Sequence, residues 1–159
     1  MNIKPYDPSH LEGVARLSLR AWAPVFDSLQ QVFAPAVYDT FYPQGWRVSQ
    51  DKAVRDVCAA ADFKVWVAIE SETVAGFVAL RYHAADKLGE IHMIAVDPDF
   101  QRRGIGLAMT DFAVERMKEA GMTIAMVETG GDSGHEPARA AYAKAGFGLF
   151  PVARYFKKL

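Results

Sequence analysis

Residues 90–108 read EIHMIAVDPDFQRRGIGLA, an order that predicts a strand, a turn and the start of a glycine-rich helix. The β-branched and apolar residues from Glu90 to Val96 favour a strand, and Pro98 ends it because proline cannot continue a ladder of hydrogen bonds. After Gly104, apolar residues recur at helical spacing as far as Met117. Gly121 is the stop signal of this predicted helix.

The same stretch predicts a binding site for an anionic group. A helix N-terminus leaves backbone N–H groups unpaired and carries a partial positive charge. Gly104 and Gly106 allow a ligand to approach the backbone closely, and Arg102 and Arg103 add positive charge. We therefore interpret residues 101–107 as a cradle for a pyrophosphate, and the term cradle is used below for these residues.

Length and composition indicate one globular domain spanning residues 1–159. The chain has 159 residues, of which 51% are hydrophobic and 23% charged, and its formal net charge is -1. This charge gives no argument for a nucleic-acid partner, and no run approaches the ~20 apolar residues of a membrane span. The first residues lack the apolar segment of a secretory signal, and the single Cys58 cannot form an intramolecular disulfide, so a cytoplasmic location is expected.

The pattern along the chain predicts an α+β domain in three layers, α/β/α. Strands are expected at residues 2–6, 63–69, 74–82, 90–96, 123–128 and 147–156. Helices are expected from residue 11 to before Pro24, around Val54 to Cys58, after Gly104, and over 137–145, with an aromatic-rich segment at 22–46 that is helical in pieces. Three consecutive strands followed by helical crossovers predict a mixed, mostly antiparallel central sheet.

Two motifs carry a resemblance to a known family. Gln101-Arg-Arg-Gly-Ile-Gly106 resembles the Gln/Arg-x-x-Gly-x-Gly/Ala signature of the GNAT superfamily of N-acetyltransferases, and the element order is similar across nearly the whole chain. The segment from Ala138 to Phe147 is similar to that family's Ala-x-x-Leu-Tyr-x-Lys-x-Gly-Phe, although Ala141 stands where Leu is usual. The resemblance implies a sheet with a splayed strand pair, acetyl-CoA (coenzyme A) as co-substrate without a metal, and direct acetyl transfer to an amine in a ternary complex.

The resemblance also implies where the co-substrate binds. The cradle residues would surround the CoA pyrophosphate, and the backbone of the preceding strand would bind the pantetheine amides. The residues concerned are Gln101, Arg102, Arg103, Gly104, Ile105, Gly106 and Leu107 for the pyrophosphate, and Ile94, Ala95 and Val96 for pantetheine.

The resemblance assigns catalytic residues as well. Tyr142 matches the family tyrosine that protonates the leaving thiolate, and its reference pKa of ~10 against ~8.5 for a thiol keeps it protonated at neutral pH. Glu90 stands where some members carry a carboxylate base, and His92, on the same strand face, is the second choice. His135 stands where many members have Asn and is expected to hydrogen-bond CoA or the substrate.

The acceptor is expected to be the primary amine of a small molecule or peptide. The helical segment after the first strand walls the substrate site in the resembling family, which implicates Trp22, Phe26, Tyr38 and Tyr42, while Asp27 and Asp39 would attract a cationic amine. A noncatalytic acyl-CoA-binding module, a longer acyl donor and a protein amine as acceptor stay open. A homodimer formed through exposed strand edges also stays open.

Three other chemistries are disfavoured by the residues. A Rossmann dinucleotide site would need glycine where Met109 stands. Asp132, His135 and Glu136 lack a matching cluster of metal ligands, so no metal is predicted. Cys58 lies in an apparent helix with no adjacent base, which makes it a poor nucleophile.

Overall fold

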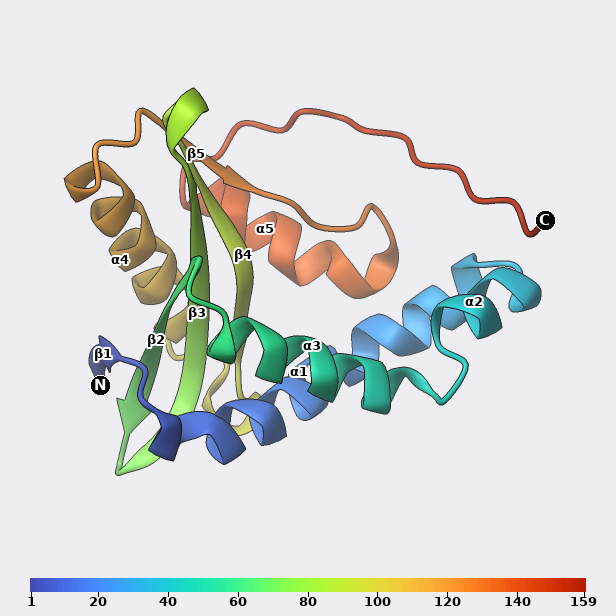
Figure 1. The fold of residues 1–159 in the computed structure, drawn as a ribbon, viewed down its shortest axis with the longest axis horizontal. Helices are drawn as coiled ribbons and strands as arrows, with labels where there is room; N and C mark the ends of the chain where they lie inside the picture. The colour runs from blue at the N-terminus through green and yellow to red at the C-terminus, as the bar shows by residue number, and fades with distance from the viewer.

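The fold is built on one five-stranded sheet in the order β1-β2-β3-β4-β5 (Figure 1). The computed structural model describes all residues, Met1–Leu159. The strands are β1 (Asn2–Pro5), β2 (Phe63–Glu70), β3 (Thr73–His83), β4 (Leu88–Val96) and β5 (Ile124–Val127). The first four pair antiparallel and β5 pairs parallel with β4, which confirms the mixed, mostly antiparallel sheet.

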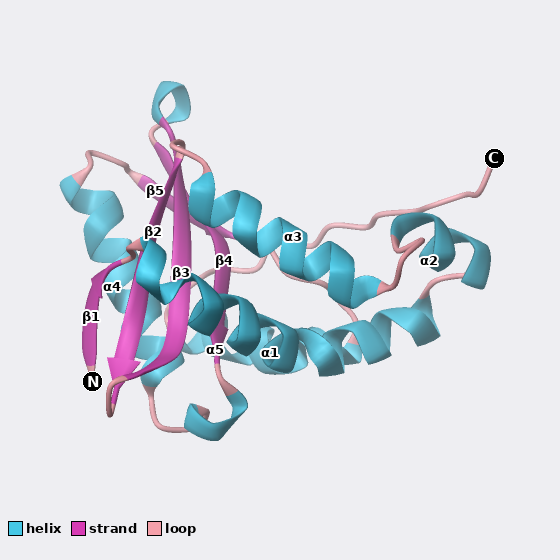
Figure 2. Ribbon diagram, turned by 60° about the horizontal axis from the view of Figure 1, so that its bottom comes forward, coloured by secondary structure: helices cyan, strands magenta, loops and turns pink.

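Helices cover both faces of this sheet (Figure 2). They are α1 (Leu11–Val32), α2 (Pro35–Phe41), α3 (Trp46–Ala59), α4 (Ile105–Glu119) and α5 (Glu136–Lys144). Leu17 of α1 and Val54 of α3 pack with Phe77 of β3 in one fully buried cluster. Met117 of α4 packs with Leu80 of β3 in a second cluster on the opposite face. Burying such side chains contributes about 1.5–3 kcal/mol each, so the amphipathic faces of these helices set the three layers.

β5 pairs with β4 along its whole length, but β4 continues beyond it. The pairing runs from Leu88 opposite Ile124 to Ile91 opposite Val127, and the rest of β4, from His92 to Val96, has no partner on that side. On its other side β4 stays paired with β3 as far as Val96. The two strands therefore separate beyond Ile91, which leaves backbone groups of β4 free on the side of the gap.

A β-bulge lies where the two strands begin to separate. Leu80 of β3 pairs with Ile91 and the preceding Ala79 pairs with Met93, so His92 is an extra residue in β4. A bulge redirects side chains and increases the local twist, and bulges are frequent beside functional sites.

The prediction that the first helix ends before Pro24 is wrong. α1 continues through Pro24 to Val32. Proline removes one donor and crowds the carbonyl four residues earlier, but it does not abolish the bonds of the following turns. Phe26 and Ser28, beyond the proline, are both buried. Their packing outweighs the local preference of the sequence for a break.

The prediction of a final strand over residues 147–156 is also wrong. After Phe147 no backbone N–H donates a hydrogen bond, and Leu149 and Phe150 are more than four-fifths exposed. Pro151 interrupts the donors that a strand would need. The segment instead runs extended to α2 (Figure 1), where the Phe156 ring packs edge-on against Phe33 and Phe41 at centroid distances of 5.5 and 5.0 Å.

No helix combines the length and the apolar composition that crossing a bilayer requires.

Candidate active site

Ion pairs of Arg20 anchor the turn between β4 and the cradle to α1. Arg20 Nη1 donates to both carboxylate oxygens of Asp97 at 2.7 and 2.8 Å, and its Nη2 reaches Asp99 Oδ1 at 3.0 Å. Asp97 is only 2% exposed and also accepts a bond from the Asp99 backbone N–H at 3.0 Å. Because the guanidinium is charged and contacts two aspartates of the turn, α1 fixes the direction in which the chain enters the cradle.

The cradle presents a run of unpaired backbone donors. Gln101 N–H bonds Pro98 O, and the next backbone N–H with a partner is that of Ala108, which donates to Gly104 O at 2.9 Å. Between them, the N–H groups from Arg102 to Leu107 donate no hydrogen bond within the chain. Donors left free in this way at the start of a helix suit an anion.

The backbone conformation of the cradle explains why glycine stands at position 104, and a side-chain bond explains how the cradle is held against β4. Gly104 is the N-cap of α4 and has φ +80°, a left-handed conformation that favours glycine. Arg102 also has a positive φ, of 61°. The Gln101 side-chain amide donates to Val96 O at 3.0 Å and so fastens the cradle to the end of β4. Arg103 lies over the Phe100 ring at 5.2 Å and, like Arg102, is exposed.

Glu90 lies between two histidines. Its Oε1 is 3.1 Å from His92 Nδ1 and its Oε2 is 2.7 Å from His83 Nε2, while its side chain is 18% exposed. The sequence-based expectation that Glu90 and His92 share a face is therefore confirmed. Burial acts to raise the pKa of Glu90, but the hydrogen bonds from the two imidazoles outweigh it and lower that pKa below the usual value.

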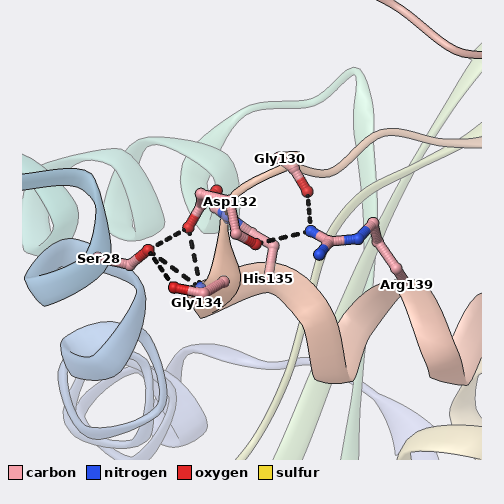
Figure 3. A network of polar contacts seen from close by, with 7 residues as sticks. Ser28, Gly130, Asp132, Gly134, His135 and Arg139 are labelled. Carbon is pink, nitrogen blue, oxygen red and sulfur yellow. Dashed lines mark hydrogen bonds and ion pairs between the residues drawn. The ribbon is translucent and has the colours of Figure 1, made fainter. Parts of the chain in front are cut away.

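His135 belongs to a separate polar network that fastens the loop before α5 to α1 (Figure 3). Asp132 accepts bonds from His135 Nδ1 at 2.5 Å and from the Ser28 hydroxyl at 2.6 Å. Arg139 Nη1 donates to the carbonyls of Gly130 and Asp132 at 2.6 and 2.7 Å. Burial would raise the pKa of Asp132, but the bonds from Ser28 and His135 hold it below its usual range. The network fixes the His135 ring against α1.

The Ser28 hydroxyl is expected to contribute measurably to stability. We expect Ser28→Ala to cost about 1.5 kcal/mol at pH 7, because it removes a hydrogen bond to a nearly buried carboxylate. Since the folded pKa of Asp132 is depressed, this contribution is present above the unfolded pKa and declines as the pH falls through the folded one, below about 4. Urea unfolding at pH 7 and at a pH below about 4 measures this contribution.

Ser9→Ala, which removes a similar bond to the exposed Asp7, is the matched control and should change the free energy of unfolding little. Equal midpoints for Ser28→Ala and the wild type at pH 7 would contradict the assignment.

Tyr142 lies on α5 with its hydroxyl free of hydrogen bonds within the chain. Its ring packs against Phe147 at a centroid distance of 6.1 Å, and burial raises its pKa to about 12. No hydrogen bond joins Tyr142 to Glu90, His92 or His135. The phenol therefore stays protonated throughout the neutral range.

The aromatic residues expected at the acceptor pack mainly against one another. Phe26 is 6% exposed, stacks on Trp46 at 4.5 Å and meets the edge of Tyr42 at 5.2 Å. Tyr38 is 9% exposed and contacts Tyr42 at 4.9 Å. Trp22 lies apart from them, against Phe77. Burial first, and then the carboxylates of Asp27 and Asp39, raise the pKa of Tyr38, which indicates negative charge near this cluster. Acceptor contacts by these four aromatic residues stay a prediction.

Cys58 is unsuited to nucleophilic chemistry, because burial raises the pKa of its thiol to about 11.

Comparison with models of known protein families shows to which family the chain belongs. The family model described as Acetyltransferase (GNAT) family matches residues 27–147, most of the chain. The chain belongs to the GNAT acetyltransferase family. Among curated relatives of this GNAT protein, mycothiol acetyltransferase of Streptomyces scabiei is 28% identical over 147 residues, covering 90% of the chain and 46% of the relative. The chain thus spans about half the length of the curated relatives it matches.

Solved structures share the fold of this GNAT protein at low sequence identity. A putative GNAT acetyltransferase from Desulfovibrio desulfuricans superimposes with a TM-score of 0.76 at 20% identity, covering 98% of this chain and 89% of that one. AAC(6')-Iy, solved with a bisubstrate analog, CoA-S-monomethyl-acetylneamine, gives a TM-score of 0.67 at 13% identity, covering 99% and 97%. These likenesses establish the fold of the domain.

Sequence reasoning missed the partners of two candidate residues. His83, on the neighbouring strand, contacts Glu90. The sequence held one indication of this contact, because His83 follows a strand that was predicted to pair with the strand of Glu90. Ser28 and Asp132 position His135, and Asp132 had been considered only as a metal ligand. No cluster of three or more His, Cys, Asp or Glu side chains is arranged to hold a metal ion.

Proposed function

We propose that this GNAT protein transfers an acetyl group from acetyl-CoA to a primary amine, by direct attack in a ternary complex. The observation that carries the proposal is the run of free N–H donors from Arg102 to Leu107 at the start of α4, beside a strand pair that separates beyond Ile91. Backbone donors, a helix dipole and two exposed arginines together suit a pyrophosphate.

The co-substrate would extend from the cradle into the gap between β4 and β5. The CoA pyrophosphate would accept bonds from the cradle, with Arg102 and Arg103 balancing its charge. The pantetheine amides would bond the free edge of β4 at Ile94, Ala95 and Val96, which have no β5 partner. A relative of the same fold was solved with a bisubstrate analog containing CoA, which supports this choice of donor.

The reaction requires a neutral amine, a base and an acid. The amine nitrogen attacks the thioester carbonyl, the bond from carbon to sulfur breaks, and the amine loses a proton. The cluster around Glu90 on β4 would take that proton, and the Tyr142 hydroxyl would donate one to the leaving thiolate. His135, held by Asp132, would hydrogen-bond CoA or the acceptor.

The acceptor we favour is a small cationic amine or the amine of a short peptide. Asp27 and Asp39 bring negative charge to the aromatic cluster around Tyr38, which suits a positively charged acceptor. Relatives named mycothiol acetyltransferases support a small-molecule acceptor.

An assay of thiol release from acetyl-CoA tests the proposal against a panel of polyamines, amino acids, neamine and peptides. We expect turnover with at least one small amine, together with binding of CoA in a calorimetric titration. Binding without turnover across the panel would favour an acyl-CoA-binding module, and turnover with peptides alone would favour a protein acceptor. Absence of CoA binding would overturn the proposal.

A further inference from the structure

The carboxylate of Glu90 has an imidazole on each oxygen, and the two contacts differ in their geometry. His83 presents Nε2 to Oε2, whereas His92 presents Nδ1 to Oε1. The Glu90 side chain is 18% exposed, and each imidazole is about one-third exposed. Glu90 is therefore enclosed by its partners, and the histidines face outward.

The contact at Nδ1 determines which nitrogen of His92 can accept a proton. A neutral imidazole carries one N–H and one lone pair, and the hydrogen bond made by one nitrogen sets the state of the other. An ionised carboxylate only accepts, so His92 must donate through Nδ1, and its Nε2 keeps the lone pair. His92 thus combines an oriented ring with a free basic nitrogen.

The bulge in β4 places His92 at the position where pairing with β5 ends. His92 is the extra residue between the pairs Leu80–Ile91 and Ala79–Met93, and it is the first residue of β4 beyond the last β5 pair. Its ring also packs against Phe63 of β2, with the centroids 4.6 Å apart. The ring is therefore held by Glu90 and by Phe63.

Relative basicity favours the imidazole over the carboxylate. Reference pKa values are ~6.5 for His and ~4.3 for Glu, so near neutral pH the imidazole is the stronger base. The two hydrogen bonds lower the pKa of Glu90 further and weaken it as a proton acceptor. Brønsted behaviour makes a base most effective when its pKa lies near the working pH.

We propose that His92 Nε2 takes the proton from the acceptor amine, and that Glu90 is a positioning residue that fixes the imidazole through Nδ1. This inference rests on the proposed acetyl transfer. As the N–C bond forms and the C–S bond breaks, the amine proton moves to Nε2 and the Tyr142 proton moves to sulfur. The imidazolium then releases its proton to solvent and the phenolate regains one, so both groups return to their starting states.

The surrounding charges are consistent with this assignment. The Glu90 carboxylate faces the imidazole on β4, and His83 and Arg81 lie on the neighbouring β3. Asp62, just before β2, pairs with Arg81 at 3.3 Å, which offsets the positive charge of that guanidinium. The Glu90 carboxylate is in direct contact with the His92 ring, at 3.1 Å.

The pH dependence of turnover in two variants distinguishes the role of His92 from that of Glu90. The acceptor is the panel amine with the fastest turnover, kept the same throughout so that its own ionisation contributes equally to every profile. For the wild type we expect kcat/KM for the acceptor to fall on the acid side more steeply than protonation of the acceptor amine alone requires. His92→Gln should lower kcat about 100-fold and leave only the fall caused by protonation of the acceptor, with the KM for acetyl-CoA unchanged. Glu90→Gln should lower kcat about 10-fold and keep the additional fall, because the imidazole remains but is no longer held through Nδ1.

Two controls keep these outcomes interpretable. His10→Gln, at a helix cap remote from β4, should leave the pH profile unchanged, and thermal melting confirms that each variant folds. An additional fall that persists in His92→Gln, or that vanishes in Glu90→Gln, would overturn the inference and return the role of base to Glu90.

A measurement that needs no turnover separates failure of this inference from failure of the proposed function. The chain has four histidines, so nitrogen-15 NMR of the imidazoles can be assigned with single His→Gln variants. We expect neutral His92 to carry its proton on Nδ1 in the wild type and to lose this preference in Glu90→Gln. A proton on Nε2 of His92 in the wild type would overturn the inference whether or not the protein turns over.

Discussion

Tyr142→Phe is expected to lower kcat for acetyl transfer about 100-fold while leaving the affinity for CoA unchanged. The variant removes one oxygen and keeps the ring that packs against Phe147. Burial raises the pKa of Tyr142 to about 12, so the wild-type phenol carries its proton throughout the neutral range. Burial disfavours a thiolate for the same reason, and the leaving sulfur therefore needs a proton as the C–S bond breaks.

Tyr82→Phe is the matched control for this prediction. Tyr82 is also partly buried, but it lies in the cluster against α4 and its hydroxyl bonds Arg116 O at 3.4 Å. Its replacement should leave kcat unchanged. The comparison needs steady-state rates and a calorimetric titration of CoA for both variants. Equal rates for Tyr142→Phe and the wild type would remove Tyr142 from the reaction.

Gly104→Val is expected to weaken CoA binding about 30-fold, equivalent to about 2 kcal/mol. Gly104 has φ +80°, a region that a β-branched residue avoids at a cost of about 1–2 kcal/mol or more. If the backbone relaxes, the N–H groups of Ile105 and Gly106 turn away from their shared direction. No atom lies within 4 Å of a Cβ built on Gly104, so the substitution should not disturb the core.

Gly121→Val is the matched control for the cradle. Gly121 follows the other end of α4, has φ +81°, and also has no atom within 4 Å of an added Cβ. Both variants should lose similar amounts of stability in urea unfolding, but Gly104→Val alone should lose CoA affinity. Equal affinity for CoA in the two variants would show that the cradle does not bind the pyrophosphate.

Much of the fold was predictable because its signals are local and periodic. The alternation in β2, the apolar run of β3, the strand that precedes Asp97-Pro98 and the helix between Gly104 and Gly121 all follow from side-chain spacing and backbone restrictions. Pro24 and residues 147–156 were misjudged because tertiary packing decides them. α1 persists through its proline because Phe26 and Ser28 are buried beyond it, and the end of the chain is held at Phe156 rather than in a ladder.

The two parts of the candidate site also differ in how far the sequence alone predicts them. The cradle is made of consecutive residues, so its members can be read from the sequence. Its unpaired N–H groups lie where the glycines and arginines predicted them. The base cluster depends on strand register. No local pattern fixes the bulge at His92 or brings His83 onto Glu90, and both follow from how β3 pairs with β4. Likewise, Ser28 and Asp132 are 104 residues apart and meet only because α1 packs against the loop before α5.

Transfer of a labelled acetyl group tests the central claim most directly. Acetyl-CoA carrying carbon-13 at the carbonyl is incubated with the protein and the best amine of the panel, and the reaction is followed by NMR. The account predicts that the label moves from the thioester to an amide carbonyl, with one free thiol appearing for each amide formed. Label that moves to free acetate, or that stays in the thioester while CoA binds, would contradict an N-acetyltransferase.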